Sequence, residues 1–171
     1  MTPEFSRTFR LDELGGTPRA VSIVAEEGER AALATRFGLI GVESLEAKAE
    51  LVRDGDMVTA SGRLEAGLTQ SCVASGEPVP AKIAEDFALR FLPAGAAPDA
   101  DEIELVESEL DEIDYQGSAI DLGEAVAQTM ALALDPFPRA VGADQKLQEA
   151  GVLGEEDAGP FAALKALKGK L

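Results

Sequence analysis

The chain has 171 residues, which suits one domain with a tail, and 46% of them are hydrophobic, enough for a buried core. Aromatic residues make up only 5%, with no Trp, so the core is expected to be aliphatic. The 32 acidic and 15 basic residues give a net charge of −17, which favours solubility and repels polyanions. We therefore expect no general affinity for naked nucleic acid and favour a basic protein as the partner.

The absence of histidine excludes Ser-His-Asp and Cys-His catalysis. Cys72 is the one cysteine, so the chain has no intrachain disulfide, and a structural zinc site would lack ligands. We expect a protein that is not an enzyme and holds no metal or cofactor. No segment approaches the ~20 apolar residues of a membrane span. The first residues lack the basic and apolar regions of a secretory signal, so a cytoplasmic location is expected.

The first elements in chain order are two short strands and a helix. Alternation predicts strands over residues 5–11 and 20–25. Alanines favour a helix over 27–37, whose first turn is acidic, as the helix dipole prefers. Gly38 is a natural C-terminal stop for it.

Three longer strands follow, and they carry the clearest pattern in the chain. Residues 44–53 alternate apolar and charged side chains, and residues 58–68 continue the alternation after the turn signal Asp54-Gly55, in a strand that could extend to Cys72. Residues 83–92 form the next predicted strand. A sheet with one buried face and one solvent-exposed face is typical of antiparallel strands. We predict a sheet of five or more strands within residues 5–92, which could curl into a partly closed barrel.

The region after the last long strand is dominated by acids. Residues 98–135, here called the acidic strip, hold 12 acids and no base, a net charge of −12. We predict a long acidic loop over about 94–114, followed by a helix over 121–134 with Asp121 and Glu124 as a capping box. Prolines 136 and 138 end that helix.

Together these elements predict an α+β fold with two main helices, both packed on the sheet. Residues 1–138 are expected to form a single domain, and residues 139–171 a flexible segment. That segment would end in a short helix over 160–167, with Phe161 on its apolar face.

Few side chains suggest chemistry by their spacing. The acidic strip lacks the pattern of a calcium loop, and it fits a solvated segment, an electrostatic docking surface for a basic partner, or an ion site. Glu85 and Asp86 are adjacent on a strand and face opposite sides, so they cannot form a carboxylate pair. Cys72 fits a semi-buried cysteine that packs as a small hydrophobe.

Three segments in order resemble the YceD family of large ribosomal RNA subunit accumulation proteins. The segment from Leu68 through Cys72 to Pro78 resembles the family's CxRC turn. The segment from Ile120 to Pro138 resembles its IDL helix and closing Pro, and the segment from Gly159 to Lys168 resembles its NPFAxLxxLK ending. The order, the spacing and the acidic insert make the set fairly specific from about residue 60 onward. The resemblance implies a bacterial cytoplasmic protein needed for normal levels of large-subunit ribosomal RNA, without a catalytic reaction.

The chain departs from the family pattern in the turn. Ser75 replaces the second cysteine, Ala74 stands where the family often has Arg, and no further Cys or His is found near residues 139–144. No metal is therefore expected at this turn, and packing and hydrogen bonds should keep its shape.

The resemblance implies a role linked to RNA, whereas the anionic surface repels RNA. Both hold if the protein binds a basic ribosomal protein or assembly factor and contacts ribosomal RNA only indirectly. An acidic adaptor that binds a basic partner outside ribosome assembly is the alternative. Candidate partner-binding residues lie in the turn, the acidic strip and the apolar anchors: Cys72, Glu77, Pro78, Asp101, Glu104, Glu107, Asp111, Asp121, Pro136, Phe137 and Phe161.

Overall fold

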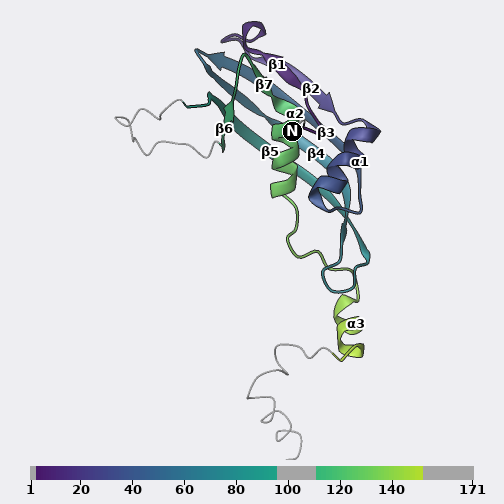
Figure 1. The fold of residues 1–171 in the computed structure, drawn as a ribbon. Helices are drawn as coiled ribbons and strands as arrows, with labels where there is room; N and C mark the ends of the chain where they lie inside the picture. The colour runs from purple at the N-terminus through teal and green to yellow at the C-terminus, as the bar shows by residue number, and fades with distance from the viewer. Residues whose placement is uncertain (1–2, 96–110, 152–171) are drawn as a thin grey trace, which may run out of the picture.

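Three long antiparallel strands form the centre of the fold in the computed structural model, which describes residues 3–95 and 111–151 (Figure 1). The elements are β1 (Thr8–Arg10), the 3₁₀ turn η1 (Leu11–Glu13), β2 (Arg19–Val24), α1 (Glu27–Phe37), β3 (Gly41–Asp54), β4 (Met57–Ser71), β5 (Pro78–Pro93), β6 (Asp111–Tyr115), β7 (Ala119–Asp121), α2 (Leu122–Leu132) and α3 (Ala143–Glu149).

The hairpin of β3 and β4 forms as its alternation predicts. Asp54 pairs with Met57 across the turn, where Gly55 adopts a φ of 60° that favours glycine. Along β3, Leu45, Ala47, Ala49 and Leu51 are buried, while their neighbours on the other face are largely exposed. Burying each leucine contributes about 1.5–3 kcal/mol, so the pattern fixes which face of the hairpin meets the core.

The main sheet is open, with the strand order β2-β3-β4-β5-β6. The described strands form no closed barrel, so the predicted curling into a partly closed barrel is not seen. Instead, α2 packs on β4 and β5 and covers one face of the open sheet (Figure 1).

Two strands differ from the prediction. The strand predicted over 5–11 does not join the main sheet: β1 pairs with β7 in a separate two-stranded sheet. The fifth strand of the main sheet is instead β6, which pairs parallel to β5. Its sequence Asp-Glu-Ile-Asp-Tyr is poor in strand-forming residues, which is why propensity placed it in the acidic loop.

The two predicted helices form on one face of the sheet. Leu33 of α1 and Val126 and Met130 of α2 join a single cluster with the buried side chains of β3, β4 and β5. Asp121 caps α2 by accepting from the Glu124 amide at 3.1 Å, as predicted. The reciprocal half of that capping box is absent, because the Glu124 carboxylate binds Arg36 at 2.7 Å instead.

The described part of the C-terminal segment contains one unpredicted helix, α3, of seven residues. It follows Gly142, whose φ is 82°, and contains Ala, Gln, Lys and Leu, which are good helix formers. The predicted helix over 160–167 lies outside the described residues.

Candidate functional site

The acidic edge of the sheet is β6, the last strand in the order. The Tyr115 carbonyl accepts from the Ala94 amide at 2.9 Å, so the backbone groups of Tyr115 face β5. Because these groups alternate in direction along a strand, those of Glu112 and Asp114 point away from the sheet. The Tyr115 hydroxyl donates to the Asp56 carbonyl at 2.6 Å and fixes the end of the strand. The described structure therefore presents an acidic, unpaired strand edge.

A groove runs beside this edge, between β6, β7 and α2. It has a volume of about 420 Å³ and an apolar floor to which Phe91, Ile113 and Ile120 contribute. Asp121 and Glu124 also line it, and Asp114 borders it, although the alternation along β6 directs the Asp114 side chain to the face opposite Ile113 and Tyr115. A groove with an apolar floor and an acidic lining fits the aliphatic stem and cationic head of a Lys or Arg side chain.

Asp121 and Glu124 are already engaged within the chain. Asp121 accepts from the Ser6 hydroxyl at 2.5 Å and from the Arg7 amide at 2.8 Å, besides capping α2. Hydrogen bonds from Arg36 lower the pKa of Glu124. These contacts give both carboxylates a structural role, and the exposed Asp114 side chain lies on the opposite face of β6 from the groove.

The turn around Cys72 is a compact hydrogen-bonded unit. The Cys72 amide donates to the Glu77 carbonyl at 2.8 Å, and the Gly76 amide donates to the Cys72 carbonyl at 2.8 Å. The connection between α2 and α3 packs against this turn through two hydrogen bonds. The Val73 amide donates to the Pro138 carbonyl at 2.9 Å, and the Ala140 amide donates to the Cys72 sulfur at 3.3 Å. Glu77 pairs with Lys146 of α3.

The sulfur of Cys72 does more than fill space. Hydrogen bonds from the Ser75 hydroxyl, then from the Ala140 amide, lower its pKa to about 7, against a smaller opposing effect of burial. The side chain is only 3% exposed, yet the loops that cover it present amides to the sulfur. The expectation of a packed small hydrophobe is therefore incomplete, because the sulfur is also a hydrogen-bond acceptor that ties two loops together.

Exposed apolar side chains lie near the same turn. Phe137 is 71% exposed and Val73 is 54% exposed, and the bond from Val73 to Pro138 brings them together in space. Pro136 is also exposed. Phe137 and Pro136 are therefore accessible, as anchors for a partner would have to be.

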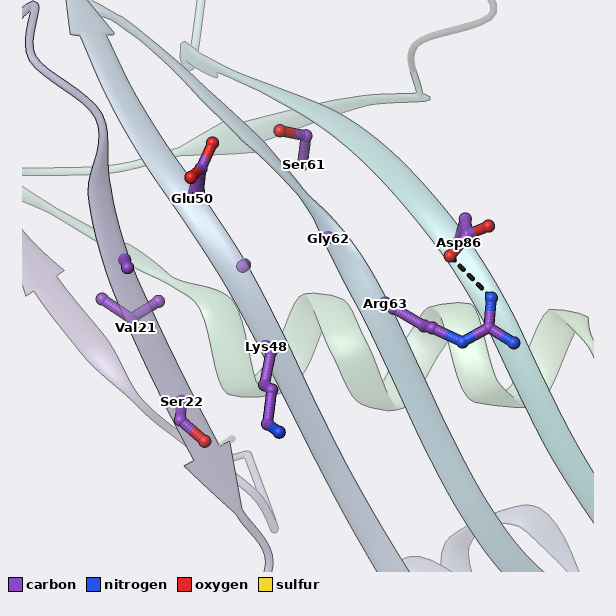
Figure 2. A pocket seen from close by; sticks show the side chains of 10 residues that line it. Val21, Ser22, Lys48, Glu50, Ser61, Gly62, Arg63 and Asp86 are labelled. Carbon is purple, nitrogen blue, oxygen red and sulfur yellow. Dashed lines mark hydrogen bonds and ion pairs between the residues drawn. The ribbon is translucent and has the colours of Figure 1, made fainter.

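The face of the sheet opposite the helices holds a shallow depression, shown in Figure 2. It has a volume of about 720 Å³ and spans β2, β3, β4 and β5. Small side chains hollow it, and a Cβ at Gly62 would meet the Lys48 carbonyl oxygen at 2.0 Å, so only glycine lets β3 and β4 approach this closely. Arg63 and Asp86 form an ion pair of 2.8 Å there. The sequence pattern gave no sign of this hollow beyond the small residues themselves.

The described residues bring together one group of the predicted site residues, namely Cys72, Glu77 and Pro78 of the turn with Pro136 and Phe137 of the connection. Asp111 lies on the acidic edge at the other end of the sheet. Asp101, Glu104, Glu107 and Phe161 lie outside the described residues. Within residues 3–95 and 111–151, no group of three or more His, Cys, Asp or Glu side chains is placed to hold a metal ion. No helix of the described parts has the length and apolarity to cross a membrane.

These features define an open-faced α+β protein whose candidate sites are a strand edge and a turn. Comparison with known families identifies it further: the family of large ribosomal RNA subunit accumulation protein YceD matches residues 60–168. The chain belongs to the YceD family, and the match covers the Cys72 turn, the acidic edge and α2. Neither the curated proteins nor the solved structures contain a chain that matches this one.

Proposed function

We propose that this protein supports the accumulation of large-subunit ribosomal RNA without catalysis, by binding a basic ribosomal protein or assembly factor at its acidic edge. Membership of the YceD family supports the link to ribosomal RNA. The single structural observation that supports a basic partner is β6, which ends the main sheet of the described residues and has three acids in five residues.

The charge distribution favours a protein partner over direct contact with RNA. The acidic strip carries −12 of the chain's −17, and β6 lies within it. Such a surface repels phosphates and attracts a basic protein, raising the rate of association. Ribosomal RNA would then be reached through the partner.

The geometry of the edge suggests how such a partner binds. An extended segment can add to the sheet through the outward backbone groups of Glu112 and Asp114, as in other cases of strand addition. A Lys or Arg side chain of that segment, on the face where α2 packs, would then lie beside the groove. Backbone pairing would give affinity, and the groove would select for a basic residue.

The test is affinity capture of the tagged full chain from lysate of its source at low salt, with and without RNase. The variant Asp111→Lys/Asp114→Lys reverses the edge charge, and Glu46→Lys/Glu50→Lys makes the same change of charge on exposed positions of β3. Large-subunit ribosomal proteins should survive RNase and be lost only with the edge variant. Equal loss with both variants would contradict binding at the edge.

The other outcomes separate the remaining functions. Recovery that disappears with RNase would make RNA the ligand and remove the electrostatic argument. Capture of a basic protein unrelated to the ribosome, still dependent on Asp111 and Asp114, would favour the adaptor role outside ribosome assembly.

A further inference from the structure

The second free edge of the sheet is β2, and its outward side is identified by one hydrogen bond. The Ala25 amide donates to the Leu45 carbonyl at 2.9 Å. The backbone N–H and C=O groups of the odd-numbered residues of β2 therefore point toward β3. The backbone groups of Ala20, Ser22 and Val24 therefore point away from the sheet. The Val24 carbonyl accepts from Arg7 at 2.9 Å, whereas no hydrogen bond within the described residues reaches the backbone of Ala20 or Ser22.

This edge lacks the usual protection against strand pairing. Exposed edges normally carry charges, prolines or bulges that prevent association. The sequence of β2, Arg-Ala-Val-Ser-Ile-Val, has one charge, no proline and three β-branched aliphatic residues, and its register with β3 is regular. The edge is therefore a template for another strand.

We propose that β2 pairs antiparallel with β2 of a second copy of this chain. In the register that uses the two free residues, Ala20 of each copy lies opposite Ser22 of the other, and Val21 lies on the two-fold axis. The result is a continuous ten-stranded sheet with the helices of both copies on one face. The depressions shown in Figure 2 would adjoin on the other face, because both reach β2.

The net charge of −17 on each chain does not prevent two copies from pairing through β2. The acidic edge lies four strands away from β2, which is about 19 Å at the usual strand spacing and beyond the screening length of about 8 Å. In the same register Arg19, the one charged residue of β2, lies opposite the uncharged Ile23 of the other copy. The contact therefore places no like charges opposite each other.

A second copy fits this edge better than the basic partner proposed above. The charged side chains that line the adjoining depression are two cations and two anions, Lys48, Arg63, Glu50 and Asp86, so no surplus of acid attracts a basic segment. When two copies of this low-charge strand pair, their free backbone N–H and C=O groups bond to each other, and no surplus of acid is needed. The inference is independent of the proposed function, since it concerns the other edge.

The first experiment measures the molar mass of the purified full chain by light scattering after gel filtration. The wild type should have twice the 17.8 kDa of one chain. Ser22→Pro removes an outward donor without touching the β3 ladder and should give the mass of one chain. Glu112→Pro makes the equivalent change at the other edge and should leave the dimer intact, with circular dichroism confirming that both variants fold.

The second experiment tests the register. The Cα atoms of a residue on the two-fold axis lie about 4.5 Å apart in a pair without hydrogen bonds, within reach of a disulfide. Val21→Cys should therefore crosslink two chains under mild oxidation. Ser22→Cys should not, because the two Ser22 positions are offset by two residues along the strand. This second variant also controls for the buried native thiol of Cys72.

A wild type with the mass of one chain would overturn the proposal, and so would a dimer that Ser22→Pro leaves unchanged. If the wild type is monomeric and Ser22→Pro loses a captured protein, the edge pairs with a foreign strand rather than a second copy. Crosslinking by Ser22→Cys alone would overturn the register.

Discussion

The five-stranded sheet ends in two edges that differ in length, charge and neighbours. β6 has five residues, three of them acidic, and lies beside a groove. β2 has six residues, one of them charged, and borders the shallow depression of the opposite face. Two copies of β6 would bring six carboxylates together, so that edge resists self-association, whereas β2 carries nothing that repels its own copy.

The proposals for the two edges assign charge on an edge strand a role in partner choice besides the prevention of aggregation. The family match over residues 60–168 includes β6 and excludes β2. The proposed binding at β6 is therefore the property to compare across relatives. Pairing through β2 is argued for this chain alone and has to be tested on it.

The largest expected effect distinguishes the two sides of β2. Val21→Pro removes an amide that faces β3 and should lower the free energy of unfolding by about 3 kcal/mol. Ser22→Pro, on the free side, should change it by about 0.5 kcal/mol. Urea unfolding of dilute protein, where the dimer is dissociated, measures both. Similar losses for the two variants would show that the outward direction of Ser22 is assigned incorrectly.

The next prediction concerns salt. Raising NaCl should release the basic partner from β6, because exposed charges are screened over about 8 Å at physiological ionic strength. The same salt should leave the molar mass of the β2 dimer unchanged, since strand pairing there depends little on charge. Capture and light scattering across one salt series compare the two edges directly, and a parallel decline of both would remove the contrast.

A smaller effect is expected at the end of the free edge of β2, where Arg7 binds the Val24 carbonyl and the Glu29 carboxylate at 2.7 Å. The hydrogen bond from Arg7 lowers the pKa of Glu29. The pair therefore stabilises the fold above the unfolded pKa of about 4.3 and loses its effect as the pH falls through the lowered value.

Glu29→Gln should accordingly lower the free energy of unfolding at pH 7 by about 0.5–1 kcal/mol, and the difference from wild type should disappear in acid. Urea unfolding at several pH values measures this. A difference that persists unchanged below the lowered pKa would mean that the carboxylate acts through packing rather than through its charge.

The smallest effect is expected at the Cys72 turn, which is remote from β2. The pKa of the Cys72 thiol is about 7 in the folded protein and higher in the unfolded chain. The thiolate therefore stabilises the fold above the unfolded pKa, and this stabilisation is lost as the pH falls through 7. Wild type should therefore gain stability relative to Cys72→Ser between about pH 7 and 8.5. The dimer mass should stay the same in this variant, and a changed mass would connect the turn with β2.

Much of the sheet could be predicted because local patterns agree with tertiary burial. The alternation in β3 and β4 placed Leu45 and Leu64 on the same buried face, and Asp54-Gly55 placed the turn between them. The helix at residues 27–37 and the cap at Asp121 followed from propensity and capping chemistry in the same way.

The candidate site was only partly predictable. Asp111 was identified as part of an acidic segment, but a strand of Asp-Glu-Ile-Asp-Tyr forms because β5 offers it an edge and Tyr115 anchors it to Asp56. The amide that reaches the Cys72 sulfur comes from Ala140, which is 68 residues away along the chain. Neither contact leaves a signal in a local window of sequence.

The sequence by itself determined the charge of this protein, its aliphatic core, its long hairpin and its membership of the YceD family, because each of these depends on composition, short-range periodicity or ordered motifs. The tertiary structure alone decided which strands end the sheet, which face remains open and which carboxylates are engaged. Those properties depend on the order of strands in space, and that order is set by the packing of α2 and by the parallel pairing of β6 between parts of the chain that are distant in sequence.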